Sequence, residues 1–158
     1  MTVITHNRRR SRLSTLIDQP GGVSVGTALK QARANLAEYE TRSREVIEEQ
    51  VSALAGMKPP SSPEAASAAL DQAYARSSAV IDAAGPFEMK DICTAAANLC
   101  DLIDAAPEDQ AFDWRIVIVH AQALRLLLTL PSEADDARAQ VLDSLKDVLK
   151  AKVPGAKD

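Results

Sequence analysis

Short segments containing proline, in two cases with glycine, divide this chain into stretches that are each about the length of one helix. The breaks fall at residues 56–62, 85–86, 107 and 131–132. Between them, apolar residues recur at intervals of three and four, which is the period of an α-helix. Because the connections are only a few residues long, consecutive helices must lie antiparallel beside each other. The pattern therefore predicts an up-and-down antiparallel helical bundle.

The composition favours helices over sheets. The 158 residues include 28 alanines and only five aromatic residues, a poor supply for a sheet core and a good one for closely packed helices. Apolar residues make up 46% of the chain and the net charge is −4, values that exclude wholesale disorder. A chain of this length can bury a real core. We expect an all-α fold of about five helices with a long N-terminal helix.

The expected organisation has four parts: a flexible basic arm at residues 1–23, a long helix at 24–57, a helical bundle at 58–153 and a disordered tail at 154–158. The bundle helices are expected at about 63–84, 87–106, 109–130 and 133–152. Ser62, Pro63 and Glu64 form a strong helix start, with a capping hydroxyl, a proline at the first helical position and an acid near the positive end of the dipole. Residues 114–119 are rich in β-branched side chains, but the apolar rhythm beyond them favours helix.

The long helix carries a stripe that is partly apolar and partly polar. Its apolar positions keep the three-four rhythm, and two polar residues, Ser43 and Gln50, interrupt it. Two arrangements fit this pattern: one end of the helix packs on the bundle and the other projects, or the helix pairs with a second copy in a homodimer. The apolar members of the stripe are Leu29, Ala32, Leu36, Tyr39, Val46 and Leu54.

Four arginines, Arg8, Arg9, Arg10 and Arg12, lie close together near the N-terminus. They could contact a protein partner, an anionic lipid or a nucleic acid, or they could belong to a solvated, mobile terminus. The pI of about 5.2 argues against general nucleic-acid binding. The sequence has no apolar run long enough to cross a membrane and no signal peptide, so we expect a cytoplasmic protein.

The sequence has few residues suited to catalysis or metal binding. Cys93 and Cys100 lie about 10 Å apart along one expected helix, too far for an intrachain disulfide, and no histidine lies nearby to complete a metal site. The only histidines are His6, in the arm, and His120, on an aliphatic helix where a packing role is expected. There is no phosphate-binding loop or zinc motif. We therefore expect no metal, no cofactor and no enzymatic activity.

One pair of residues leaves an enzymatic alternative open. Asp136 and Gln140 stand four positions apart on the last expected helix, so they share one face of it. Helical phosphatases use this spacing to orient a water molecule toward an aspartyl phosphate on a response regulator. The alternative to a binding protein is therefore a phosphatase of this kind, and a structural dimeric helical protein is a further one.

The segment from Ser78 to Ile92 resembles the helical hairpin of histidine-phosphotransfer (Hpt) domains. Gly85, Phe87 and Met89 fall where that family has the packing residues of its turn and following helix. The start of the chain, Ser11–Gly22, also resembles small alphaproteobacterial chemotaxis proteins of the CheE type. The resemblance implies an Hpt-like bundle that docks a response-regulator receiver domain or another chemotaxis protein.

The residues that carry phosphotransfer in this family are missing here. Ser78 stands where the resemblance places the phosphoacceptor histidine, Ile81 replaces the lysine, and Asp82 and Glu88 replace glycines. A serine phosphate is too stable to return its phosphoryl group in this relay. The resemblance therefore implies docking without phosphotransfer.

A helical wheel gives the position of Ser78 without reference to any family. At 100° per residue, the apolar face of its helix is centred near Leu70 and Ser77, and Ser78 lies about 100° away from it. We therefore expect Ser78 at the rim or on the outer face. The candidate docking surface consists of Ala75, Ser78, Ala79 and Asp82.

Overall fold

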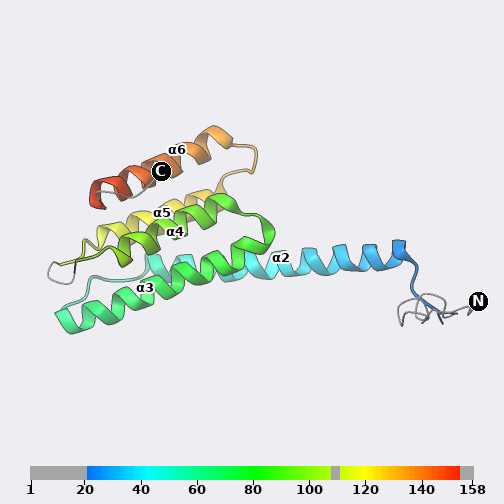
Figure 1. The fold of residues 1–158 in the computed structure, drawn as a ribbon, viewed down its shortest axis with the longest axis horizontal. Helices are drawn as coiled ribbons and strands as arrows, with labels where there is room; N and C mark the ends of the chain where they lie inside the picture. The colour runs from blue at the N-terminus through cyan, green and yellow to red at the C-terminus, as the bar shows by residue number, and fades with distance from the viewer. Residues whose placement is uncertain (1–20, 108–110, 154–158) are drawn as a thin grey trace, which may run out of the picture. The chain divides into compact units, whose positions relative to one another are not determined.

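A computed structural model of the chain describes residues 21–107 and 111–153. Within these ranges the fold is all-helical and contains no strand, which confirms the expected fold class. The elements are α2 (Val25–Ala55), α3 (Pro63–Ala84), the 3₁₀ helix η1 (Gly85–Phe87), α4 (Lys90–Asp104), α5 (Arg115–Thr129) and α6 (Asp135–Lys152) (Figure 1). The expected arm at residues 1–23 and tail at 154–158 lie almost wholly outside the described residues.

The chain divides into two compact units between Glu38 and Tyr39, a point that lies inside α2. The helix starts where the sequence supplies a cap. The Ser24 hydroxyl accepts a hydrogen bond from the Thr27 backbone N–H at 3.2 Å. This bond satisfies one of the free N–H groups of the first turn. The long N-terminal helix expected from the sequence is therefore present.

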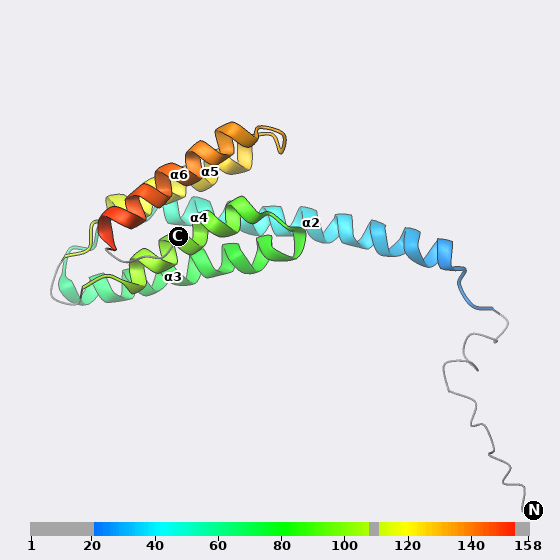
Figure 2. The same cartoon turned by 45° about the horizontal axis from the view of Figure 1, so that its top comes forward.

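In the second unit, α3 and α4 lie side by side and run antiparallel (Figures 1 and 2). As expected, Ser62 caps α3, and its hydroxyl accepts a hydrogen bond from the Ala65 backbone N–H at 3.3 Å. Hydrogen bonds from its own backbone N–H and from the Ser62 hydroxyl lower the pKa of Glu64 in the first turn. The capping signal in the sequence thus fixes the start of this helix correctly.

Two helices start later than the sequence suggests. The helix expected from about residue 87 begins at Lys90, because Gly85–Phe87 form a 3₁₀ turn and Glu88 then takes a left-handed conformation with φ 55°. The helix expected from about residue 109 begins at Arg115, and residues 111–114 before it are not helical. The β-branched segment that follows Trp114 is helical, as its apolar rhythm favours.

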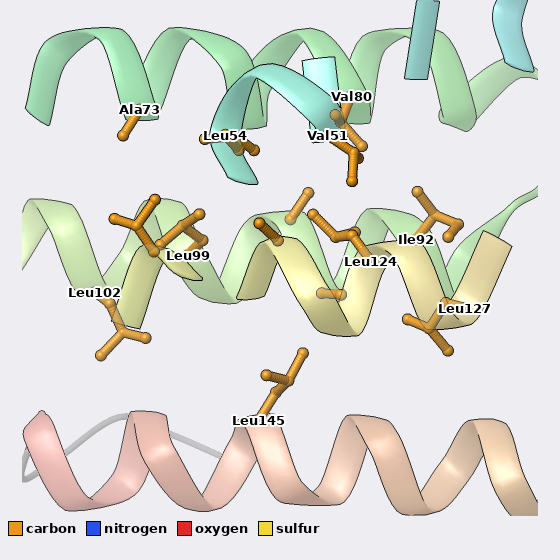
Figure 3. Packing of buried hydrophobic residues seen from close by; sticks show 14 of the residues in the cluster. Val51, Leu54, Ala73, Val80, Ile92, Leu99, Leu102, Leu124, Leu127 and Leu145 are labelled. Carbon is orange, nitrogen blue, oxygen red and sulfur yellow. The ribbon is translucent and has the colours of Figure 1, made fainter. Parts of the chain in front are cut away.

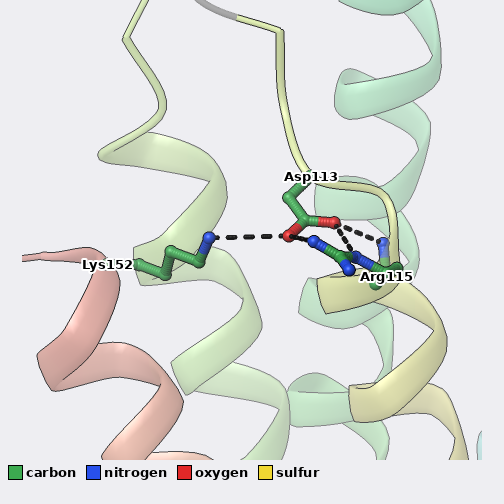
Figure 4. A network of polar contacts seen from close by, with 3 residues as sticks. All are labelled: Asp113, Arg115 and Lys152. Atoms are coloured by element: carbon green, nitrogen blue, oxygen red, sulfur yellow. Dashed lines mark hydrogen bonds and ion pairs between the residues drawn. The ribbon is translucent and has the colours of Figure 1, made fainter.

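Asp113 holds the start of α5 in place. Its carboxylate accepts hydrogen bonds from the Arg115 backbone N–H at 3.2 Å and from the Arg115 guanidinium at 2.8 Å (Figure 4). Lys152, at the end of α6, lies 3.5 Å from the same carboxylate. The Arg115 guanidinium holds the pKa of Asp113 well below its usual range. These contacts connect the start of α5 to the end of α6.

The core lies between the bundle helices and draws apolar side chains from all five α-helices. In Figure 3, side chains of α2 and α3 point toward those of α4 and α5, and Leu145 reaches the same core from α6. Alanines at 73, 84, 95, 96 and 121 are fully buried, which lets the helices approach closely. The largest fully buried apolar side chains are Ile47, Leu54, Leu99, Leu124, Leu127, Leu145, Val51, Val80 and Val117.

Arg138 joins three helices through its guanidinium group. It donates to the Asp91 carboxylate, at the start of α4, at 2.6 Å. It also donates to the backbone carbonyls of Leu127 and Leu130, at the end of α5, at 2.9 and 3.1 Å. The positive charge therefore lies at the negative end of the α5 dipole and caps its free carbonyls. In the described part of the chain, no helix is long and apolar enough to cross a membrane.

Candidate functional site

The four residues of the candidate docking surface lie on α3. Ala75 and Asp82 are exposed, and Ser78 and Ala79 are half-buried. The position of Ser78 agrees with the rim expected from the helical wheel. The face offers short side chains and one carboxylate, so a partner could approach the helix backbone closely and immobilise few flexible side chains.

The opposite side of α3 explains why this face is turned outward. Ala73, Ser77, Val80 and Ala84 recur at intervals of three and four, and all are fully buried. The Ser77 hydroxyl is satisfied because it donates to the Ala73 carbonyl at 2.9 Å. A residue one step along the helix is rotated by about 100°, which brings Ser78 to the edge of the buried face.

The turn between α3 and α4 has an unusual backbone conformation at Glu88. Its φ of 55° and ψ of 28° lie in the left-handed region, and its backbone N–H donates to the Gly85 carbonyl at 3.2 Å. Non-glycine residues adopt this region at a cost of roughly 1–2 kcal/mol. Glu88 is the residue that stands where the Hpt resemblance places a glycine. The backbone thus adopts a conformation suited to glycine at a position occupied by glutamate.

The other two positions that differ from the Hpt pattern also lie on α3. Ile81 is half-buried and packs against the core, so it could not place a charged group beside Ser78 without repacking. Asp82 is exposed and adds a negative charge near Ser78. A phosphoryl group on Ser78 would therefore lie near the Asp82 carboxylate and would lack the lysine that Ile81 replaces, and like charges repel.

A small groove of about 210 Å³ lies between α3 and α4 and is lined by Asp71, Tyr74, Ile103 and Asp104. The apolar rhythm of α3 predicts an inward-facing Tyr74, but its side chain is 39% exposed at the rim of this groove. The neighbouring Asp104 carboxylate is the largest cause of the raised pKa of the Tyr74 phenol. The groove adds negative charge to the same hairpin.

A larger groove of about 440 Å³ lies beside the turn and the start of α4. It is bordered by Arg44, Phe87, Lys90, Leu128 and Ser132, among others. Arg138 and Asp91 form part of its wall, but each already satisfies the other. The groove is lined by side chains of both signs of charge.

Neither cysteine has the properties of a nucleophile. Burial raises the pKa of the Cys93 thiol, and burial together with Asp104 and Asp101 raises that of Cys100 to about 11. Both cysteines are free. At neutral pH they are therefore uncharged thiols that pack in the interior.

His120 is fully buried in α5 and has one unsatisfied nitrogen. Its Nδ1–H donates to the Ile116 carbonyl at 2.8 Å, whereas Nε2 is buried with no hydrogen-bond partner among the described residues. Burial lowers the pKa of the imidazole, so the ring is neutral at pH 7. Because its side chain is fully buried in the core, His120 has the packing position expected from the sequence.

Asp136 and Gln140, the candidate phosphatase residues, are both exposed in the first half of α6. They lie on one face a turn apart, as the spacing predicts. They belong to a different helix from Ser78, so the structure does not combine the two candidate sites in one element. Arg8, Arg9, Arg10 and Arg12 lie outside the described residues.

The contact that sequence reasoning missed is the ion pair of Arg138 with Asp91. The two residues are 47 positions apart, and neither belongs to a recognisable motif. The sequence gives one weak indication that Arg138 has an ion-pair partner, because it is a lone cation just after two acids in the first turn of its helix. Local sequence cannot show which distant carboxylate such a cation meets.

No group of three or more potential ligands in the described part of the chain could hold a metal ion. Comparison of the chain with protein-family models, with curated proteins and with solved structures found no match.

Proposed function

We propose that this protein is a non-catalytic binding protein of two-component or chemotaxis signalling. In this proposal it docks a receiver domain, or another signalling partner, on the face formed by Ala75, Ser78, Ala79 and Asp82. The observation that carries the proposal is the conformation of Glu88. The hairpin takes the left-handed turn that suits glycine at the position where Hpt domains have one. This turn conformation supports an Hpt-like hairpin, whereas the side chains that carry phosphotransfer in that family are absent from its outer face.

The absence of phosphotransfer follows from the chemistry of this face. Ser78 stands where the family has its phosphoacceptor histidine. Ile81 packs against the core where a lysine would be needed. A phosphoserine ester would also be too stable to pass its phosphoryl group to a receiver aspartate. Binding, competition or scaffolding remains as the function that such a face can support.

The test is a pull-down from an alphaproteobacterial lysate with the purified chain as bait, followed by mass spectrometry. Recovery of receiver-domain or chemotaxis proteins supports the proposal if Ala75→Arg and Ser78→Arg baits lose them. Ala139→Arg is the matched control, because it places the same side chain on an exposed position of α6. Retention by all three variants, or loss only with Ala139→Arg, would place binding elsewhere.

The phosphatase alternative is favoured by one observation, the exposure of Asp136 and Gln140 side by side on α6. It requires that the chain accelerate loss of the acyl phosphate from a receiver domain phosphorylated with acetyl phosphate. The alternative predicts faster decay with the wild-type chain than with Gln140→Ala. The binding proposal predicts the same decay with both chains and with buffer alone.

A further inference from the structure

The N-terminal part of α2 is exposed to solvent along its length. Every residue from Gly21 to Tyr39 is exposed. Helices of about 12–15 residues are only marginally stable in water without tertiary contacts. Gly26 and Asn35 lower the helix propensity further. Packing of its apolar side chains against another surface would therefore stabilise this part of α2.

The exposed segment carries a heptad pattern of apolar residues. Leu29 and Leu36 are seven residues apart and occupy the a position, while Val25, Ala32 and Tyr39 occupy the d position. The large side chains among them are 53–77% exposed, with Val25 at 77%, Leu36 at 63%, Tyr39 at 61% and Leu29 at 53%. Exposed apolar stripes of this kind mark interaction surfaces.

A heptad stripe packs best against another helix with the same repeat, because each knob enters a hole formed by four residues of the partner. A second copy of this chain supplies such a helix. In a parallel dimer, residues at g face residues at e of the other copy. Here Ala28 at g would face Arg33 at e, and Asn35 at g would face Glu40 at e.

These flanking pairs contain no repulsion in the parallel arrangement. The Asn35 amide could donate to the Glu40 carboxylate of the second copy, while the ion pair of Glu40 with Arg44 in the same chain is retained. An antiparallel arrangement that pairs Leu29 with Tyr39 would instead bring Arg33 opposite its own copy. Like charges in that place are destabilising.

We infer that the apolar stripe of α2 from Val25 to Tyr39 is a parallel homodimer interface. The heptad pattern and the residues at its edges point to a second copy as the occupant, and the exposure of the stripe leaves it accessible. This inference does not depend on the proposed function, because the docking surface lies on α3 and the stripe lies on α2.

The first experiment measures the mass of the full chain in solution by sedimentation equilibrium over a range of concentrations. The expected result is twice the 16.9 kDa of one chain. Leu36→Glu should raise the dimer dissociation constant by at least about 100-fold, because two buried carboxylates would face each other. Ala34→Glu is the matched control, since position 34 lies at f on the outer side of the same helix, and it should stay dimeric. A wild-type chain that is monomeric at every concentration would overturn the inference.

A second experiment tests the orientation by oxidative cross-linking in a Cys93→Ala, Cys100→Ala background. In a parallel dimer the Leu29→Cys thiols of two copies face each other, so a covalent dimer should form. Ala34→Cys, on the outer side, should not cross-link. Dimers that sediment normally but fail to cross-link through Leu29→Cys would show that the helices are not parallel and in register.

Discussion

The backbone conformation of Glu88 lowers the stability of the chain. Its backbone lies at φ 55°, a region that side chains with a Cβ atom disfavour. The neighbouring bonds of the turn keep it there, since the Glu88 N–H donates to Gly85 and the Lys90 N–H donates to Glu88. The strain thus belongs to the turn that joins α3 to α4.

Glu88→Gly is expected to raise the free energy of unfolding by about 1 kcal/mol, because glycine adopts the left-handed conformation without a Cβ penalty. Urea denaturation followed by circular dichroism at 222 nm measures the change. Glu88→Ala is the control and should leave the stability nearly unchanged, since alanine keeps the Cβ. Equal stability of the glycine and alanine variants would mean that the turn does not hold Glu88 in this conformation.

His120 should make the stability depend on pH. Burial lowers its pKa in the folded chain, so the unfolded chain binds the proton more readily. The contribution of His120 is then complete above the unfolded value of about 6.5 and is lost as the pH falls below it, by up to about 1.4 kcal/mol per pH unit. His120→Leu should show a shallower loss between about pH 7.5 and 5.5 in urea denaturation. Parallel profiles for the two chains would contradict this assignment.

At the scale of the elements, the sequence predicts helix starts well where a side chain caps the helix. Ser62 and Pro63 give the start of α3 correctly, because the capping bond is local. The sequence predicts the start of α4 too early, at about residue 87. The helix begins at Lys90, because the 3₁₀ turn and the left-handed Glu88 extend the connection. The rim position of Ser78 follows from periodicity alone, whereas the exposure of Tyr74 depends on α4 and could not be read from its own helix.

The position of α6 against α4 and α5 depends on Arg138. Arg138→Met keeps much of the side chain's apolar stem but removes the hydrogen bonds to Asp91 and to the carbonyls of Leu127 and Leu130. We expect a loss of about 2 kcal/mol, because a partly buried carboxylate and two helix-end carbonyls lose their donor. Thermal and urea unfolding measure it.

Arg44→Ala, on α2, is the control for Arg138→Met. It removes the ion pair with Glu40, whose two side chains are about half exposed on one helix. Exposed pairs of this kind contribute about 0.3–0.5 kcal/mol. If both variants lose the same small amount, the contacts of Arg138 do not hold the three helices together.

At the scale of the whole molecule, the two units differ in how they are stabilised. The buried core begins at Ile47, and all of its members belong to the second unit. The first unit contributes no buried residue among those described. The sequence could indicate the long helix but not this division, because the apolar stripe runs past it to Tyr39 and is first interrupted at Ser43.

Removal of residues 1–38 should therefore leave the bundle folded. The core from Ile47 onward is unchanged by the deletion, so the midpoint of urea unfolding and its m-value should match those of the full chain at concentrations where both are monomeric. The shortened chain should also remain monomeric at concentrations where the full chain forms dimers, because it lacks the stripe on α2. A lower midpoint would show that the first unit stabilises the bundle within one chain, and a dimer that survives the deletion would place the interface on the second unit.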